Sequence, residues 1–325
     1  MNRRQFLESV TVGCAAAAAA AAKHEPRALP IIDTHQHLWD LTRFKLPWLK
    51  EGSPLARSFL LADYRQATEG LNVVRTIYME VAVAPSQHEA EAHYVIEMCR
   101  RPENRMAAAV ISGRPAASDF RKYITRFKDS PWIKGIRQVL HGSDTPNGYC
   151  LDAAFVKGVQ LLGELGLSFD LCVRSAELSH AARLIDQCPQ TRFILDHCGN
   201  ANVQERDQSQ WRRDIAAVAR RKNVIGKVSG IVASARPGAW TADDLAPIVN
   251  HTLEVFGPDR VVFGGDWPVC TRVATFRQWV EALRTIVRDR KIEEQRKLFH
   301  DNAVLFYNLK SASRERQRPE DPSGR

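Results

Sequence analysis

The chain carries the stretch Ile31-Ile32-Asp33-Thr34-His35-Gln36-His37, an apolar run that ends in two histidines one residue apart. Alternate residues of a β-strand point to the same side, so both imidazoles should face one point at the end of this predicted strand. Burying two imidazoles costs free energy, which is unexpected unless both serve a common function. The pair therefore favours catalysis or metal binding over two unrelated structural roles.

Two later segments end in the same way. The run 192–197 passes from apolar residues into His197, and the run 260–266 passes into Asp266. Two glycines before Asp266 let the backbone bend, and Pro268 ends the strand, so the carboxylate is expected at a loop mouth. Parallel strands that deliver such groups at one end predict a barrel with a hydrolytic site at that end.

Eight short β-rich runs alternate with helical patterns along the chain, which predicts an α/β fold of the (β/α)8 TIM-barrel type. The predicted strands cover 29–34, 74–80, 106–112, 133–140, 167–173, 192–196, 224–229 and 260–265. The clearer predicted helices cover 86–101, 153–165, 176–187, 211–222, 245–256, 277–287 and 293–307. The segment 39–64 lacks clear periodicity, and a long loop after the first strand is expected to lie over the barrel mouth as a lid.

The N-terminus reads as a separate element from the barrel domain, which is predicted over 29–309. Residues 1–28 place Arg3 and Arg4 before a short, alanine-rich apolar stretch. This order predicts a twin-arginine-type signal peptide and short leader, hence the twin-arginine export machinery as a partner and a periplasmic or secreted protein. An amphipathic helix, or a lipoprotein with Cys14 as its modified cysteine, are alternatives. The apolar stretch is too short for a stable membrane span.

The net charge of +9 arises partly in this leader and partly in residues 310–325, which are predicted to form a disordered basic tail. No run of Lys and Arg is interleaved with aromatic residues, so nucleic acid is not expected as a partner. A positive site that attracts an acidic substrate is favoured instead. Seven cysteines form no CxxC pair, which argues against a zinc knuckle.

Several motifs resemble the amidohydrolase-related family 2, in its sugar-lactonase-like branch, which is similar to L-fuconolactonase and 2-pyrone-4,6-dicarboxylate lactonase. They occur in the family's order: IIDTHQHLWDLTRFKLPWL (31–49), GIRQVLH (135–141), FILDHCG (193–199), KVSG (227–230), FGPDRVVFGGDWPV (256–269) and DNAVLFYNL (301–309). The resemblance covers about residues 29–309 and implies a TIM barrel that hydrolyses lactones.

The chain departs from the wider amidohydrolases, which use a Lys or Glu after strand four and a His after strand five. Here the fifth strand offers no histidine, and the fourth offers Arg137 or His141. Two metal ions are therefore not expected. The sequence leaves either one divalent ion, most simply Zn²⁺, on His35, His37 and Asp266, or a metal-independent site.

The leading hypothesis is hydrolysis of a sugar-acid lactone or similar cyclic ester, with an acidic or polyhydroxylated small molecule as substrate. Asp266 is the predicted general base for water. His35, His37 and His197 are predicted to polarise the carbonyl, either directly or through the ion. A metal-dependent decarboxylase of the same family, and a periplasmic sugar-acid binding protein without turnover, are the rival interpretations.

Four further residues are predicted substrate contacts. Arg137 is a candidate clamp for a carboxylate or hydroxyls, since a guanidinium binds such groups bidentately, and the alternative is a salt bridge inside the barrel. Glu80 is predicted either to bind hydroxyls or to pair with Arg137. His141 and Trp39 complete the set, Trp39 as a stacking surface for a sugar ring or as simple packing.

Overall fold

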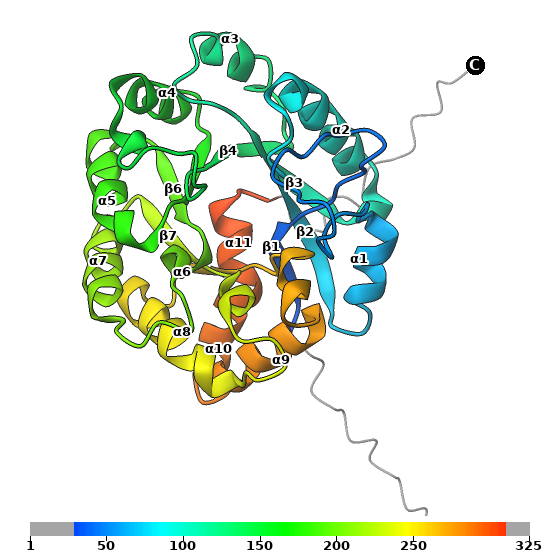
Figure 1. The fold of residues 1–325 in the computed structure, drawn as a ribbon, viewed down its shortest axis with the longest axis vertical. Helices are drawn as coiled ribbons and strands as arrows, with labels where there is room; N and C mark the ends of the chain where they lie inside the picture. Colours follow the sequence, from blue (N-terminus) through cyan, green and yellow to red (C-terminus); the bar gives the residue numbers. More distant parts are fainter. Residues whose placement is uncertain (1–28, 310–325) are drawn as a thin grey trace, which may run out of the picture.

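The computed structural model describes residues 29–309, so the predicted leader and tail lie outside the described residues. Eight parallel strands follow one another around a single sheet, with helices on the outside (Figure 1). A parallel bridge between Gln36 and Trp267 joins the two edges of the sheet. The strands are β1 (Ile31–Gln36), β2 (Val73–Met79), β3 (Met106–Ser112), β4 (Ile133–Val139), β5 (Ser168–Cys172), β6 (Arg192–Leu195), β7 (Val224–Val228) and β8 (Val261–Phe263). The predicted (β/α)8 barrel is confirmed.

The helices lie where the chain returns between strands, and their starts are set by local capping. At α4, for example, the Asp152 carboxylate accepts hydrogen bonds from the Ala154 and Phe155 amides, which satisfies two otherwise unpaired donors. The α-helices are α1 (Leu61–Ala67), α2 (His88–Arg100), α3 (Phe120–Thr125), α4 (Ala153–Glu164), α5 (Leu178–Gln187), α6 (His197–Asn200), α7 (Ser209–Ala219), α8 (Ala242–Phe256), α9 (Phe276–Val287), α10 (Ile292–Arg296) and α11 (Asn302–Phe306).

The C-terminal helix differs from the continuous 293–307 helix that the sequence predicts. A five-residue π-helical turn, Lys297–Asp301, separates α10 from α11. Directly after it, the Asn302 side-chain amide donates to the carbonyls of Pro258 and Val261, both at 2.8 Å. The wider turn thus coincides with an anchor that ties α11 to the start of β8.

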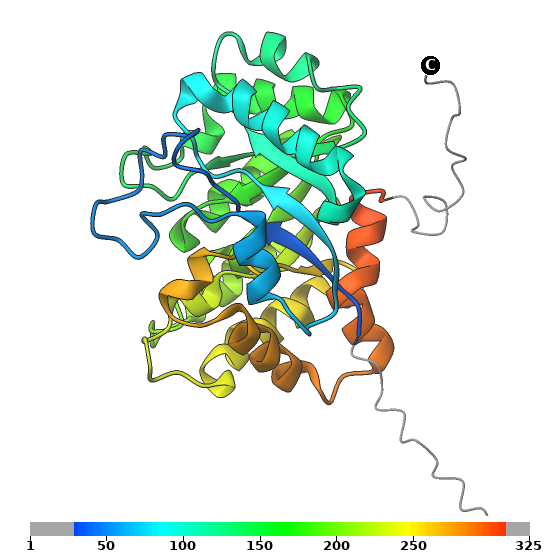
Figure 2. The same ribbon diagram turned by 90° about the vertical axis from the view of Figure 1, so that its right-hand side faces the viewer.

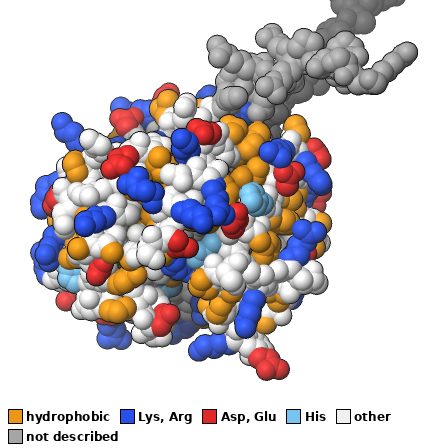
Figure 3. Space-filling view, turned by 90° about the horizontal axis from the view of Figure 1, so that it is seen from above, with side chains coloured by type: hydrophobic (Ala, Val, Ile, Leu, Met, Phe, Trp, Pro, Cys, Tyr) orange, Lys and Arg blue, Asp and Glu red, His pale blue; other side chains and the backbone are white. Residues whose placement is uncertain are grey.

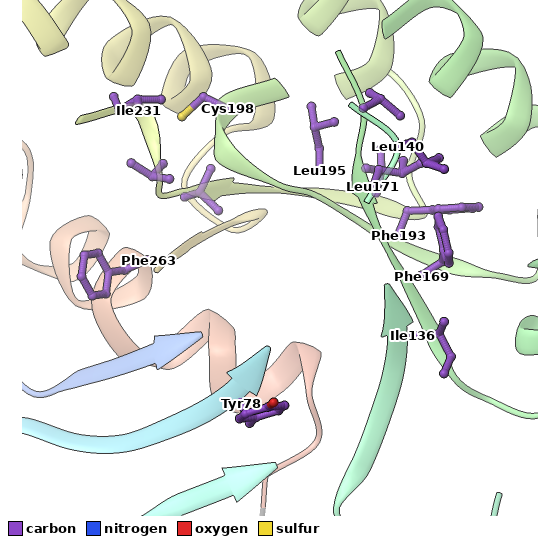
Figure 4. Packing of buried hydrophobic residues seen from close by; sticks show 14 of the residues in the cluster. Tyr78, Ile136, Leu140, Phe169, Leu171, Phe193, Leu195, Cys198, Ile231 and Phe263 are labelled. Carbon is purple, nitrogen blue, oxygen red and sulfur yellow. The ribbon is translucent and has the colours of Figure 1, made fainter. Parts of the chain in front are cut away.

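Alternation along the strands divides the core into two layers. Outward side chains such as Phe169 and Phe193 pack side by side against the helices, with ring centroids 6.4 Å apart (Figure 4). Inward side chains such as Ile77 and Val110 form a second cluster inside the barrel, together with Tyr307. Burial on both faces explains why the strands are nearly continuous apolar runs.

The two ends of the barrel differ in what covers them. Figure 2 shows α11 at one end and the long segment after β1 projecting from the other. Since α11 closes the end at which the strands begin, only the carboxyl ends of the strands remain for a pocket. Among residues 29–309, no helix is long and apolar enough to cross a membrane, and the six cysteines are buried thiols.

Candidate active site

A pocket of about 970 Å³ opens at the carboxyl ends of the strands, as expected for the active face of this fold. It is lined by residues from most of the strand-to-helix loops. The segment after β1, predicted to lie over the mouth, contributes Trp39, Pro47, Trp48, Lys50 and Leu55. A volume of this size suits a small organic molecule.

At the floor of the pocket, β1 and the loop after β8 bring three predicted site residues together. Oδ1 of Asp266 lies 3.4 Å from Nε2 of His37 and 3.6 Å from Nε2 of His35. The Nδ1–H of His37 donates to the Met79 carbonyl at 2.9 Å, which leaves Nε2 facing the carboxylate. A proton or a cation between these atoms would relieve their repulsion.

Asp33 holds this arrangement in place, and the sequence analysis gave it no role. Its Oδ1 accepts from the amides of His35 (3.0 Å) and Gly265 (2.7 Å), and its Oδ2 accepts from the Tyr64 hydroxyl at 2.7 Å. The carboxylate therefore fastens β1 to the loop that carries Asp266. Burial raises the pKa of Asp33, although these hydrogen bonds oppose the shift.

His197 follows β6 in a left-handed turn, with φ of 54° at His197 and 51° at Cys198. Such strained backbone is found mainly at functional sites. Nδ1 of His197 lies 2.9 Å from the Ser229 hydroxyl, so Nε2 is left for another partner. Gly230, itself at φ of 66°, has to be glycine because a Cβ there would lie 2.3 Å from Nδ1 of His197. This contact gives the KVSG motif a physical role.

Beneath the histidines lies a buried network of opposite charges. Nε of Arg137 lies 2.7 Å from Oε1 of Glu80, and its Nη1 lies 3.4 Å from Asp196. On the other side, Nζ of Lys227 lies 2.7 Å from Asp170 and 2.9 Å from Asp196. Arg137, Asp170 and Lys227 lie within β4, β5 and β7, Glu80 and Asp196 directly follow β2 and β6, and all five side chains are almost completely buried. Buried charges need partners of this kind.

Two cations of this network flank the His35 ring, one beside each ring nitrogen. Nη1 of Arg137 lies 3.1 Å from Nε2 of His35, and Nζ of Lys227 lies 3.4 Å from Nδ1. Burial lowers the pKa of His35 well below its usual value, and Lys227 reinforces the shift against the opposing effect of Asp196. Burial likewise lowers the pKa of His197. Both imidazoles are therefore neutral near pH 7.

The pKa values of the three carboxyl groups in the network shift in different directions. Burial alone would raise the pKa of Asp196, but Lys227 and His35 hold it well below its usual value. At Asp170 burial prevails over Lys227 and raises the pKa to about 7. At Glu80 burial is outweighed by Arg137, so the pKa of Glu80 is lowered. The network thus holds firm negative charges at Glu80 and Asp196.

The four predicted substrate contacts occupy different places. Arg137 lines the pocket but is also paired, so the salt bridge and the pocket position coexist. Glu80 is fully buried, lies outside the pocket lining and accepts from Arg137, Ser112 and Ala82. It supports Arg137 because its oxygens have no access to a ligand. His141 is exposed at the mouth.

Trp39 lines the pocket but is 1% exposed and donates from Nε1 to the Arg57 carbonyl at 2.7 Å. Its ring meets Trp48 edge-on, with centroids 5.6 Å apart, and Trp48 is bound in turn to the Val81 carbonyl. These contacts make Trp39 a packed wall of the pocket. The Trp48 ring, which is 41% exposed, is the more accessible aromatic surface.

The side chains of this site could bind one divalent ion, but the ligands differ from the predicted set of His35, His37 and Asp266. Ligand atoms of His35, His197 and Asp266 lie within 4.8 Å of one another, so His197 stands where the sequence placed His37. Two imidazoles and a carboxylate match the ligands of catalytic zinc. Cys172, Asp196 and His197 form a second such group. Each group contains one ligand that already contacts a cation: Asp196 lies 2.9 Å from Lys227, and Nε2 of His35 lies 3.1 Å from Arg137.

The sequence analysis overlooked Asp170 and Lys227. Both lie inside short, mostly apolar strands, in the runs SFDLC and VIGKV, where alternation points them into the barrel. The sequence does contain a signal for this pair, because it places opposite charges at inward positions of β5 and β7. A buried charge requires a partner on a nearby strand.

Comparison with known proteins agrees with this geometry. The chain is 27% identical to an L-fucono-1,5-lactonase of Burkholderia multivorans, over 75% of this chain and 84% of that protein. It is 22% identical to an L-rhamnono-gamma-lactonase of Scheffersomyces stipitis, over 86% of this chain and 98% of that protein. A solved amidohydrolase of Burkholderia multivorans with bound zinc superposes with a TM-score of 0.76 at 26% identity, over 86% of this chain and all of that one.

The family model described as amidohydrolase matches residues 32–309, which is almost the whole described barrel. This span includes every predicted site residue from His35 to Asp266. The chain is therefore an enzyme and belongs to the amidohydrolase family.

Proposed function

We propose that the protein hydrolyses a lactone by adding water to the ring carbonyl. The observation that carries the proposal is the Asp266 carboxylate at the pocket floor, within 3.4–3.6 Å of two imidazoles. Relatives named as lactonases across most of the chain support the same reaction class.

In this mechanism Asp266 accepts a proton from the attacking water as the C–O bond to the carbonyl forms. His37 and His197 line the pocket beside Asp266, next to the place where negative charge develops on the carbonyl oxygen, and His35 lies buried beside them. The ring C–O bond then breaks, and the proton held by Asp266 passes to the leaving oxygen. The products are a carboxylic acid and a hydroxyl on one open chain, and ionisation of the acid releases one proton to solvent.

Arg137 and Lys227 stabilise the buried charges of this site. Burial, reinforced by Lys227, keeps His35 neutral, and the two cations compensate the buried carboxylates around it. A divalent ion held by His35, His197 and Asp266 would supply Lewis-acid polarisation of the carbonyl when bound.

Around this centre the pocket offers groups for a polyhydroxylated ligand. The side-chain carbonyl oxygen of Gln138 is buried and has no hydrogen-bond donor among residues 29–309. Asn200 and Ser143 also line the pocket. A ligand hydroxyl would satisfy Gln138, because a buried acceptor without a partner is costly.

The test is a panel of aldonolactones, including L-fuconolactone and L-rhamnonolactone, with proton release followed by a pH indicator. Asp266→Asn should lower kcat by about a hundredfold or more, because a positioned base contributes on that scale. Circular dichroism establishes that the variant is folded. Near-normal turnover by Asp266→Asn would remove this carboxylate from the mechanism.

A second arm separates the reaction class. The same preparations receive aromatic carboxylic acids, and released CO₂ is measured. Release of CO₂ without any lactone opening would replace the lactonase proposal with a decarboxylase. Tight binding of sugar acids with neither reaction would point to a binding protein instead.

A further inference from the structure

We propose that the substrate carries an apolar substituent on its lactone ring, an alkyl or aryl group, and that Trp48 binds this substituent at the mouth of the pocket. This inference rests on the proposed lactone hydrolysis and names its substrate class. It follows from an apolar surface beside the catalytic floor that the hydrolytic step itself does not use.

One side of the pocket is built almost entirely from apolar side chains, and we call this side the apolar wall. Its members come from the segment after β1 and from the loop after β2: Pro47, Trp48, Leu55, Val81, Val83 and Pro85. Between Trp39 and Pro85, Lys50 is the only charged residue of the lining, and the others have hydrocarbon or indole side chains.

The facing side of the pocket is polar, with Asn200 and Asn202 in its lining after β6. Because the strands follow one another around the barrel in chain order, the loops after β1 and β2 lie across the mouth from those after β5 and β6 (Figure 1). A ligand between the two sides therefore meets hydrogen-bonding groups on one side and hydrocarbon on the other.

Trp48 is the large accessible side chain of the apolar wall. Its ring is 41% exposed, whereas Leu55, Val81 and Val83 are at most 4% exposed. Within residues 29–309, the other exposed large apolar side chains all lie outside the pocket lining: Leu41, Leu60, Ile292 and Leu305. On the outer face drawn in Figure 3, apolar side chains are interspersed with charged ones. Such scattered exposure is ordinary on an outer surface, but an exposed apolar ring inside a concave site indicates an apolar ligand group.

The accessible part of the Trp48 ring offers no hydrogen bond to a hydroxylated ligand, because its one polar atom is already used. Nε1 donates to the Val81 carbonyl at 2.7 Å. The ring also meets Trp39 edge-on, with an interplanar angle of 89°, which fixes its orientation. The surface that remains is hydrocarbon, and burying an alkyl or aryl group against it removes apolar area of both partners from water.

Hydrogen bonds between the two loops make the apolar wall a built surface. The Ala84 amide donates to the Lys45 carbonyl at 2.8 Å, and the Lys45 amide donates to Oε1 of Gln87 at 2.7 Å. Nε2 of Gln87 donates in turn to the Arg43 carbonyl at 2.9 Å. These bonds tie the segment after β1 to the loop before α2. A surface held in this way loses little conformational freedom when a ligand binds.

The apolar wall begins next to the catalytic floor. His37 donates from Nδ1 to the Met79 carbonyl, and Trp48 donates from Nε1 to the Val81 carbonyl, two residues further along the same segment. Two residues of chain span about 7 Å at most, so a substituent of a few carbon atoms can reach Trp48 from a ring at the floor. The pocket of about 970 Å³ is large for a small-molecule site, and a lone lactone ring would leave the wall in contact with water.

The experiment uses δ-lactones that share one ring and differ in the length of their side chain. Hydrolysis of δ-valerolactone, δ-hexalactone, δ-octalactone and δ-decalactone is followed by proton release, with L-fuconolactone in the same assay. Calorimetry measures the binding of the corresponding 5-hydroxyalkanoates, which are the ring-opened products. The variants are Trp48→Ala and Trp48→Phe. Leu305→Ala is the control, since Leu305 is 77% exposed and lies outside the pocket lining.

In the wild type, kcat/KM should rise roughly fourfold for each methylene group that reaches the apolar wall, the effect of burying one CH₂. Trp48→Ala should reduce the gain from δ-valerolactone to δ-decalactone by about tenfold, because most of the accessible ring is lost. Trp48→Phe should keep most of the gain, since a phenyl ring still offers apolar surface. Leu305→Ala should leave the gain unchanged. The wild-type series decides the question even if Trp48→Ala does not fold.

Equal kcat/KM along the wild-type series, or an unchanged gain in Trp48→Ala, would overturn the inference and leave lactone hydrolysis intact. A loss in Trp48→Ala as large for L-fuconolactone as for δ-decalactone would also overturn it, because Trp48 would then bind the ring itself. Binding of the hydroxyalkanoates that strengthens with chain length, without opening of any lactone, would instead overturn the proposed function and support the apolar site. The two failures are therefore distinguishable.

Discussion

Replacing Lys227 by methionine tests whether the buried charge network holds the barrel together beneath the active site. The Lys227 ammonium lies 2.7 Å from Asp170 and 2.9 Å from Asp196, and all three side chains are 0% exposed. Methionine keeps a similar length but leaves two carboxyls facing each other without their cation. Removing one partner of a buried ion pair costs about 3–5 kcal/mol, so the free energy of unfolding should fall by that amount.

The assay is urea unfolding at pH 7, followed by tryptophan fluorescence. The double variant Lys227→Met with Asp170→Asn should recover part of the loss, because Asp196 keeps Arg137 at 3.4 Å. Lys297→Met is the control, since Lys297 pairs with Asp259 at the surface, where their side chains are 39% and 73% exposed. Such exposed pairs contribute about 0–1 kcal/mol.

A loss in Lys227→Met no larger than that in Lys297→Met would refute the reasoning. It would mean that the two carboxyls lose their charge at little cost when the ammonium is absent. Failure of the double variant to recover any stability would show that Lys227 acts through packing and not through charge.

Three further outcomes are expected. Burial, reinforced by Glu80, raises the pKa of Glu91 to about 7 from its ordinary 4.5, so this carboxyl stabilises the fold below pH 4.5 and that contribution is lost as the pH rises to 7. Wild type should therefore lose more unfolding free energy between pH 5 and pH 8 than Glu91→Gln. Metal analysis should find at most one divalent ion per chain, and chelation should reduce activity without unfolding the barrel; two tightly held ions would contradict the single site. Changing Arg3 and Arg4 to lysine should trap precursor in the cytoplasm, since the export receptor reads the arginine pair, and normal processing of that variant would reject the twin-arginine interpretation.

Much of the fold was predictable because eight short β-rich runs alternate with helical patterns. The strand boundaries agree within about two residues at most ends, as at β3, which matches over Met106–Ser112. Helices α1 and α3 were missed, and they have only seven and six residues. Two turns of helix are too few to show a 3.6-residue period, so only local capping could have indicated them.

The candidate site was predictable where a polar residue ends an apolar strand. His35, His37, His197 and Asp266 follow that pattern, and the structure brings all four together, with His35 buried beside the three that line the pocket. What the sequence could not provide was which atoms face each other. The presence of His197 instead of His37 in the candidate ion-binding group accompanies the left-handed turn after β6, which no local pattern in FILDHCG predicts.

The number of buried charges bears on both the metal content and the protonation state of this site. Two cations, Arg137 and Lys227, pair with three carboxyls, Glu80, Asp170 and Asp196, and a fourth, Asp266, lies beside His35. Burial raises the pKa of Asp170 to about 7, so this carboxyl is partly protonated near neutral pH, and at least one negative charge still remains beside His35. A proton shared with the imidazoles would offset one of these negative charges, one divalent ion would cancel or slightly exceed them, and two ions would exceed them clearly. We therefore expect at most one divalent ion at this site, and under the proposed mechanism Asp266 takes its proton from the attacking water.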